Sequence, residues 1–165
     1  LLALTGAPVF GWAKPVPVIK ERLDNPRFGM MAVAAAGPGT NFILAAIGAV
    51  VLGLLARGAT PPEGLFGFSV VALQFFIMIN IFLGLFNLLP LPPFDGSHIV
   101  EGLLPPRAAR TYEKLRPFGF PLLFLLLLVI PWFFPGLGIV ERVVLPPVLW
   151  AEGKYMALAG WIAGL

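Results

Sequence analysis

Residues 87–96 read Asn-Leu-Leu-Pro-Leu-Pro-Pro-Phe-Asp-Gly, and they place an acid, Asp95, directly after three prolines. No charged residue occurs from 64 to 94, so Asp95 ends a long uncharged run. A carboxylate at bilayer depth costs roughly 2.5–3.5 kcal/mol on insertion scales, which makes it a candidate functional residue. The prolines end the preceding helix because they donate no backbone hydrogen bond. Non-helical backbone at this depth is tolerated where it lines a cavity or is buried in protein, so the stretch predicts a polar pocket with Asp95 in its wall.

The composition indicates a membrane protein. Of the 165 residues, 59% are hydrophobic and 12% are charged, whereas about a quarter of the residues of a soluble domain are charged. The uncharged runs 28–56, 64–94 and 117–140 each exceed the ~20 residues that cross a bilayer as a helix. We therefore expect one membrane-embedded domain over residues 1–165, an all-α polytopic transmembrane helix bundle. Its expected spans are 29–56, 66–89 and 117–134, followed by a weak interfacial or spanning segment at 143–164.

The segments between the spans predict an orientation. Basic residues gather in the loops 14–27 and 107–116, which places both loops on the cytoplasmic side, with the turn 57–65 outside. Asp95 precedes the second basic loop, so its pocket opens nearer the cytoplasm. Alternating prolines and β-branched residues at 15–19 predict a short extended segment.

Local patterns add expectations about packing. Gly37, Asn41, Ala45 and Gly48 share one helix face and predict the close approach of another helix. Asp95 is a suitable N-cap for a short helix through about Leu104. The net charge of +3 does not indicate nucleic-acid binding, because the basic residues sit beside the spans. The chain has no cysteine, which excludes disulfides and thiolate metal sites.

Four stretches together resemble the C-terminal part of the site-2 protease family, in its compact prokaryotic branch without a PDZ domain. The first is Gly11-Trp12-Ala13-Lys14-Pro15-Val16-Pro17-Val18, and the second is Ala36-Gly37-Pro38-Gly39-Thr40-Asn41. The third, Phe86-Asn87-Leu88-Leu89-Pro90-Leu91-Pro92-Pro93, runs into the fourth, Phe94-Asp95-Gly96. Family members are zinc metalloproteases that cut substrates within the membrane.

The resemblance implies a Zn²⁺ site with Asp95 as one ligand and two histidines from an H-E-x-x-H helix. It also implies that Asn87 holds or polarises the substrate backbone, and that Val16 and Val18 line an unwound substrate. The implied partners are transmembrane protein substrates and the lipid bilayer, in a multi-pass protein of the plasma membrane, the inner membrane of a prokaryote. This chain has no H-E-x-x-H, and its one histidine is His98. We expect an upstream part of the protein to carry that motif and the chain alone to be inactive.

Each of these interpretations has an alternative. The alternative for Asp95 is a plain N-cap at the membrane surface. The alternative for Asn87 is a helix–helix hydrogen bond with no other role. The alternative for the segment with Val16 and Val18 is a stiff loop. For the whole protein, one rival is a relative that binds membrane segments without cutting them. The other is a transporter or channel fragment in which Asp95 binds an ion.

Overall fold

The computed structural model describes residues 24–57, 64–138 and 140–165, and over these ranges the chain is helical without a strand. This confirms the expected all-α bundle. The extended segment around Val16 and Val18 lies outside the described residues. The α-helices are α1 Pro26–Ala56, α2 Gly64–Asn87, α3 Asp95–Leu103, α4 Pro106–Glu113, α5 Gly119–Phe124, α6 Ile130–Phe133 and α7 Leu145–Ala163. Short 3₁₀ or π segments occupy Arg116–Phe118, Leu125–Val129, Pro135–Leu137 and Val140–Val144.

Three helical stretches are long and apolar enough to cross a membrane: Pro26–Ala56, Gly64–Asn87 and Pro106–Phe133. Large apolar side chains on them stay exposed, among them Leu65 at 81% and Trp132 at 83%. Contact with lipid exposes no apolar side chain to water. The three apolar helical stretches and their exposed apolar side chains therefore indicate a membrane protein. The expected loop at 107–116 is wrong, because most of it forms α4. Pro106 begins this helix, and proline at the first helical position has its φ angle already set for helix.

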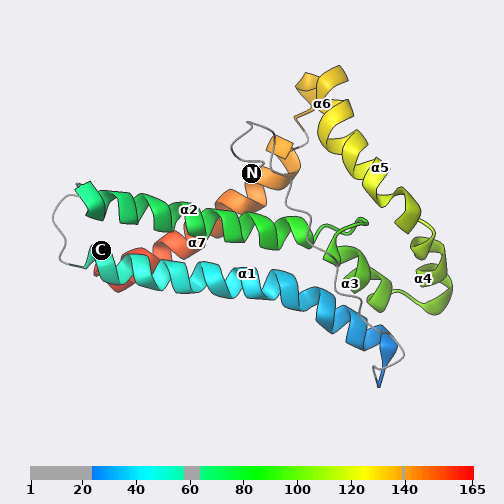
Figure 1. The fold of residues 1–165 in the computed structure, drawn as a ribbon, viewed down its shortest axis with the longest axis horizontal. Helices are drawn as coiled ribbons and strands as arrows, with labels where there is room; N and C mark the ends of the chain where they lie inside the picture. The colour runs from blue at the N-terminus through cyan, green and yellow to red at the C-terminus, as the bar shows by residue number, and fades with distance from the viewer. Residues whose placement is uncertain (1–23, 58–63, 139) are drawn as a thin grey trace, which may run out of the picture.

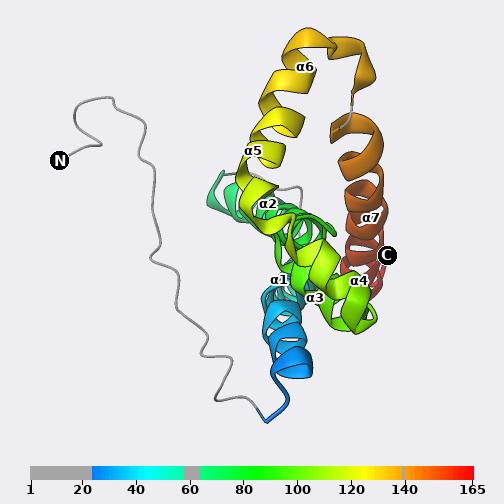
Figure 2. The ribbon, with the colours of Figure 1, turned by 90° about the vertical axis from the view of Figure 1, so that its right-hand side faces the viewer.

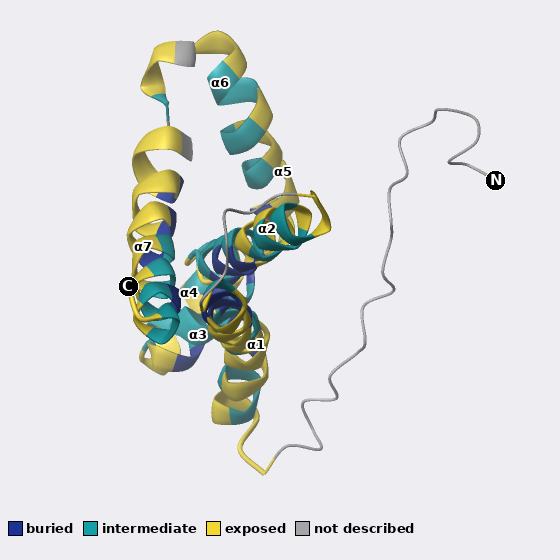
Figure 3. Cartoon of the chain, turned by 90° about the vertical axis from the view of Figure 1, so that its left-hand side faces the viewer, coloured by how far each residue is buried: buried dark blue, intermediate teal, exposed yellow. Residues whose placement is uncertain are grey.

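The helices α1 and α2 run side by side, and α7 crosses both (Figure 1). Their contact faces form the buried core, while the outward faces are exposed (Figure 3). Ala45 is fully buried, as its place on the predicted small-residue face requires. A Cβ added to Gly48 would lie 2.9 Å from Ile77 Cγ1. Small residues on α1 therefore let α2 approach closely, as predicted from their spacing.

The segment from α5 to α6 leaves this bundle and rises away from α1 and α2 (Figure 2). Its aromatic side chains are exposed, including Phe120 at 68% and Phe133 at 70%. The segment meets the rest of the chain at its base, where a Cβ on Gly119 would lie 2.7 Å from Pro92 Cβ. The base of the segment from α5 to α6 thus packs against the broken stretch that precedes Asp95.

That broken stretch is present where the prolines predicted it. The helix α2 ends at Asn87, and residues 88–94 form turns and bends before α3 begins at Asp95. The chain reverses tightly here: a Cβ on Gly96 would overlap the Leu88 carbonyl oxygen. Only glycine fits at this position, because the obstructing atoms belong to the backbone and cannot rotate away.

Candidate active site

Asp95 is half-buried at the first residue of α3. Its carboxylate lies against α1, where a Cβ added to Gly37 would be 3.0 Å from Asp95 Oδ2. Two motif stretches that lie far apart in the sequence therefore meet in space. The missing side chain of Gly37 leaves the room that the carboxylate occupies.

The alternative role of Asp95 as an N-cap is wrong. The N-cap position of α3 belongs to Phe94, which makes no side-chain capping hydrogen bond. Within the described residues, the Asp95 carboxylate accepts no hydrogen bond and forms no ion pair. Its oxygens are therefore available to a ligand.

Asn87 is the last residue of α2 and is half-buried. The ring of Phe86 packs edge-on against the ring of Phe94 with centroids 4.5 Å apart. This contact brings the end of α2 to the start of α3, and Asn87 and Asp95 each directly follow one member of the aromatic pair in the sequence. The Asn87 amide has no hydrogen-bond partner in the part of the chain that the structure describes.

Asn80 behaves differently from Asn87, although both lie on one face of α2. Asn80 is 5% exposed, and its Nδ2 donates to the Phe76 carbonyl oxygen over 2.8 Å. Its amide is thus engaged within its own helix. Asn87 is the amide that remains available beside the broken stretch.

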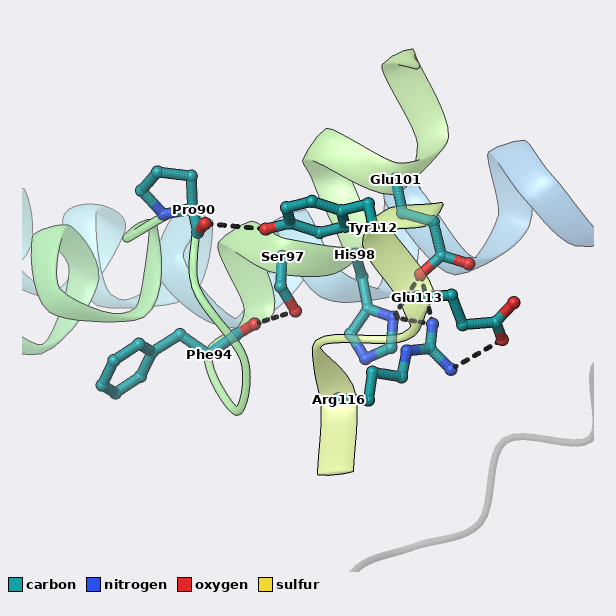
Figure 4. A network of polar contacts seen from close by, with 8 residues as sticks. All are labelled: Pro90, Phe94, Ser97, His98, Glu101, Tyr112, Glu113 and Arg116. Atoms are coloured by element: carbon teal, nitrogen blue, oxygen red, sulfur yellow. Dashed lines mark hydrogen bonds and ion pairs between the residues drawn. The ribbon is translucent and has the colours of Figure 1, made fainter. Parts of the chain in front are cut away.

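The broken stretch is held by side chains of α3 and α4. Tyr112 Oη on α4 donates to the Pro90 carbonyl oxygen over 2.7 Å, and Ser97 Oγ donates to the Phe94 carbonyl oxygen over 2.7 Å (Figure 4). The Tyr112 hydroxyl gives the Pro90 carbonyl a hydrogen-bond donor, and the Phe94 carbonyl accepts from both the hydroxyl and the backbone N–H of Ser97. Neither hydrogen bond was predicted from the sequence. Nothing in the spacing of Tyr112 indicates a contact with Pro90.

His98 belongs to a charged network rather than to Asp95. Arg116 Nη2 lies 3.2 Å from His98 Nδ1 and also donates to Glu101, while Arg116 Nη1 lies 3.5 Å from Glu113 Oε1 (Figure 4). Glu101 Oε2 lies 3.9 Å from His98 Nδ1. The sequence signal for this network was the spacing of three between His98 and Glu101, ahead of a basic segment.

The described residues offer only part of a metal site. They contain no group of three His, Cys, Asp or Glu side chains arranged to hold an ion. Asp95 fits the role of one oxygen ligand, since its carboxylate is half-buried and unpaired. Any further donors to a metal at Asp95 would lie outside the described residues. Val16 and Val18, the predicted substrate contacts, also lie outside them.

Comparison with known proteins supports the motif reading. The profile of Peptidase family M50 matches residues 59–130, which include the broken stretch, Asn87 and Asp95. The chain is 44% identical over 125 residues to the "Putative zinc metalloprotease YwhC" of Bacillus subtilis, covering 74% of this chain and 56% of that protein. It is 40% identical over 74 residues to the "Zinc metalloprotease Rip1" of Mycolicibacterium smegmatis, covering 44% of this chain and 14% of that protein.

A third relative is the "Putative zinc metalloprotease MJ0611" of Methanocaldococcus jannaschii, 34% identical over 87 residues, covering 52% of this chain and 40% of that protein. The chain thus spans about half of YwhC and less of the other two. No solved structure matches. Residues 59–130 of this chain belong to peptidase family M50, the site-2 protease family, and the resemblance drawn from the motifs is confirmed.

Proposed function

We propose that this chain is the C-terminal portion of an intramembrane zinc metalloprotease that hydrolyses peptide bonds of transmembrane proteins. The observation that carries the proposal is the Asp95 carboxylate, half-buried and unpaired among the described residues, against Gly37. It stands in the segment that matches Peptidase family M50. The relatives named as zinc metalloproteases make Zn²⁺ the metal.

In this mechanism Asp95 supplies one ligand oxygen, and two histidines of an H-E-x-x-H helix in another part of the protein supply the rest. Two imidazoles and one carboxylate leave a fourth position open, as catalytic zinc sites require. When bound, zinc supplies Lewis-acid activation of water and of the scissile carbonyl.

The remaining steps use the residues beside Asp95. The Asn87 amide donates to a substrate carbonyl and holds it near the metal ligand. The broken stretch at 88–94 leaves room for substrate backbone, which must unwind because an intact helix hides its carbonyls. The segment around Val16 and Val18 pairs with the unwound substrate as an added strand. The protein is multi-pass in the plasma membrane, with this site toward the cytoplasm.

The decisive test is Asp95→Asn in the full-length protein, which keeps the shape and removes the charged ligand. We expect zinc content and cleavage of a transmembrane substrate to be lost, while the thermal unfolding midpoint of the metal-free protein stays at the metal-free wild-type value, because bound zinc itself would raise the midpoint. Asp24→Asn is the matched control, because Asp24 is exposed just before α1. Native zinc content in Asp95→Asn would overturn the ligand assignment.

Measurements of zinc binding, substrate cleavage and ion flux on the wild-type protein distinguish the proposed protease from its alternatives. A wild-type protein that binds zinc but cuts no membrane substrate is the non-catalytic relative. A wild-type protein that binds no zinc but moves ions through liposome membranes is the transporter. Either outcome contradicts the proposed protease.

Asn87→Ala tests the substrate contact. Removing one preorganised donor from a developing oxyanion typically lowers kcat by about 10²–10³, and we expect a loss near the lower end with zinc content unchanged. Asn80→Ala is the control, because that amide is bonded within its own helix. Equal losses of kcat in the two variants would show that Asn87 serves packing alone.

A further inference from the structure

A second polar site lies one helical turn beyond Asp95, on the charged side of α3. It is a pocket of about 290 Å³ between the start of α1, the end of α3 and α4. Its charged lining consists of Arg27, Arg110, Arg116, Glu101 and Glu113, with His98 beside them. Met30 and Pro106 contribute apolar wall. Neither the metal ligand Asp95 nor Asn87 lines it, so it is separate from the proposed catalytic centre.

The pocket lies at the boundary of the membrane. Arg27 is the last charge before the uncharged run 28–56, and Arg116 is the last charge before the uncharged run 117–140. Both runs belong to helical stretches able to cross a bilayer. Because their charged ends meet in one pocket, the two spans reach the membrane surface at the same level. The pocket therefore opens where lipid headgroups lie.

The positive charges in the pocket outnumber the negative ones. Both carboxylates, Glu101 and Glu113, are paired with the single guanidinium of Arg116. Arg27 donates through Nε to the Gly102 carbonyl oxygen over 2.7 Å, and through Nη2 to the Leu104 carbonyl oxygen. These carbonyls are neutral, and Arg27 forms no ion pair with a carboxylate among the described residues.

Arg110 is the least engaged of the three arginines. It is exposed on α4 and has no hydrogen bond or ion pair with another described residue. Two guanidinium groups, those of Arg27 and Arg110, thus face the pocket without an ion pair to a described carboxylate, and the lining carries one more arginine than carboxylates. Guanidinium groups bind phosphate with two parallel hydrogen bonds, which suits such a pair.

Exposed apolar side chains are next to three of the pocket's lining residues in the sequence. Phe28 is 55% exposed next to Arg27, Leu103 is 69% exposed next to Gly102, and Leu115 is 42% exposed next to Arg116. A free anion gains nothing from such side chains, whereas the acyl chains of a lipid cover them. The combination of two arginines without an ion pair and exposed apolar neighbours in the sequence favours an amphiphilic ligand.

We propose that this pocket binds the phosphate group of an anionic phospholipid, with Arg27 and Arg110 as its ligands and the acyl chains along the exposed apolar side chains. Basic pockets between membrane helices on the cytoplasmic side bind anionic headgroups by this chemistry. The bound lipid would tie α4 to the start of α1. Since α4 also holds Pro90 through Tyr112, it would steady the broken stretch as well.

The test is lipid binding by the full-length protein in detergent, measured by native mass spectrometry. Dioctanoyl phosphatidylglycerol is the anionic probe, dioctanoyl phosphatidylcholine the zwitterionic one, and inorganic phosphate the free anion. We expect phosphatidylglycerol to bind more tightly than both. Arg110→Gln should weaken it about fivefold, the effect of one basic residue near a membrane surface. Arg110 has no partner among the described residues, so its replacement should not unfold the protein.

Arg57→Gln is the matched control, since Arg57 caps the opposite end of α1 and carries the same charge. We expect it to bind phosphatidylglycerol as the wild type does. Equal binding of the two lipids would overturn the proposal, as would equal weakening by Arg110→Gln and Arg57→Gln. Displacement of the anionic lipid by inorganic phosphate at the same concentration would assign the pocket to a free anion instead.

Discussion

The two ends of α1 use the same residue type for different purposes. Near its start, Gly37 faces the Asp95 carboxylate, with Oδ2 3.0 Å from where a Cβ would stand. Near its end, Gly53 faces backbone of α7, where the Ala159 carbonyl oxygen would lie 2.6 Å from such a Cβ. At the first glycine the free space holds a charged group, and at the second it holds the main chain of another helix.

This difference separates two tasks of the bundle. The end near Gly53 belongs to the buried core, where close backbone approach provides dispersion contacts. The end near Gly37 is exposed and places the one carboxylate that the family resemblance assigns to a metal. A methyl group added at each end should therefore affect different measurements: stability at one end and ligand affinity at the other.

The largest effect on stability is expected for Gly53→Ala. The added Cβ would meet Ala159 backbone and also Ile162 Cβ at 2.8 Å, and backbone cannot move without shifting α7. Overpacking of this kind costs typically about 1–3 kcal/mol. The unfolding midpoint in detergent should fall, while zinc affinity per folded molecule stays at the wild-type level. A change in zinc affinity as well would show that the two ends are coupled.

A smaller free-energy change, in a different quantity, is expected for Gly37→Ala. The new methyl group pushes against Asp95 Oδ2, so the carboxylate must turn or withdraw. We therefore expect zinc affinity to fall about tenfold, which is the lower bound for disturbing a residue that supports a metal ligand. Zinc titration of the full-length protein measures it. The unfolding midpoint should change little, because the neighbour is a side chain.

Gly39→Ala is the control for that experiment. It lies on the same helix two residues away, and a Cβ there would meet nothing within 4 Å. Alanine is favoured over glycine in a helix by about 0.8–1.0 kcal/mol, so this variant should be slightly more stable and bind zinc normally. Equal zinc affinities in Gly37→Ala and Gly39→Ala would refute a positioning role for Gly37.

The smallest effect is expected for Tyr112→Phe, which removes the hydrogen bond to the Pro90 carbonyl oxygen and leaves the ring. A typical hydrogen bond contributes about 0.5–1.5 kcal/mol, and this one is exposed, so the loss should lie at the lower end. Hydrogen exchange of residues 88–94 is the sensitive measurement, because the broken stretch should open more often. Unchanged exchange there would mean that Gly119 and Ser97 hold it without Tyr112.

Much of the fold was predictable because hydropathy and proline positions, which determine where helices cross the bilayer and where they break, are local properties of the sequence. Uncharged runs marked α1 and α2, and three prolines marked the break after Asn87. The segment 107–116 was misread as a loop, since its charges suggested solvent while Pro106 allowed a helix. The role of Asp95 as a metal ligand stays a prediction, whereas its alternative role as the N-cap of α3 is wrong, because Phe94 occupies that position.

The residues around the site were less predictable. The hydrogen bond from Tyr112 to Pro90 and the seat of Asp95 against Gly37 join residues 22 and 58 positions apart (112 − 90 and 95 − 37). The network of Arg116 with His98, Glu101 and Glu113 depends on how α3 and the start of the third span are oriented. No periodicity records such an orientation.

The sequence by itself determined that this protein is helical, lies in a membrane, breaks its second span at prolines and carries one acid after the break. These features follow from hydropathy and backbone chemistry, which act within a few residues of one another. Only the tertiary structure decided that the acid rests on Gly37 and that Arg27 and Arg110 share a pocket. Such meetings depend on side-chain shape and helix packing between distant segments, which no local pattern contains.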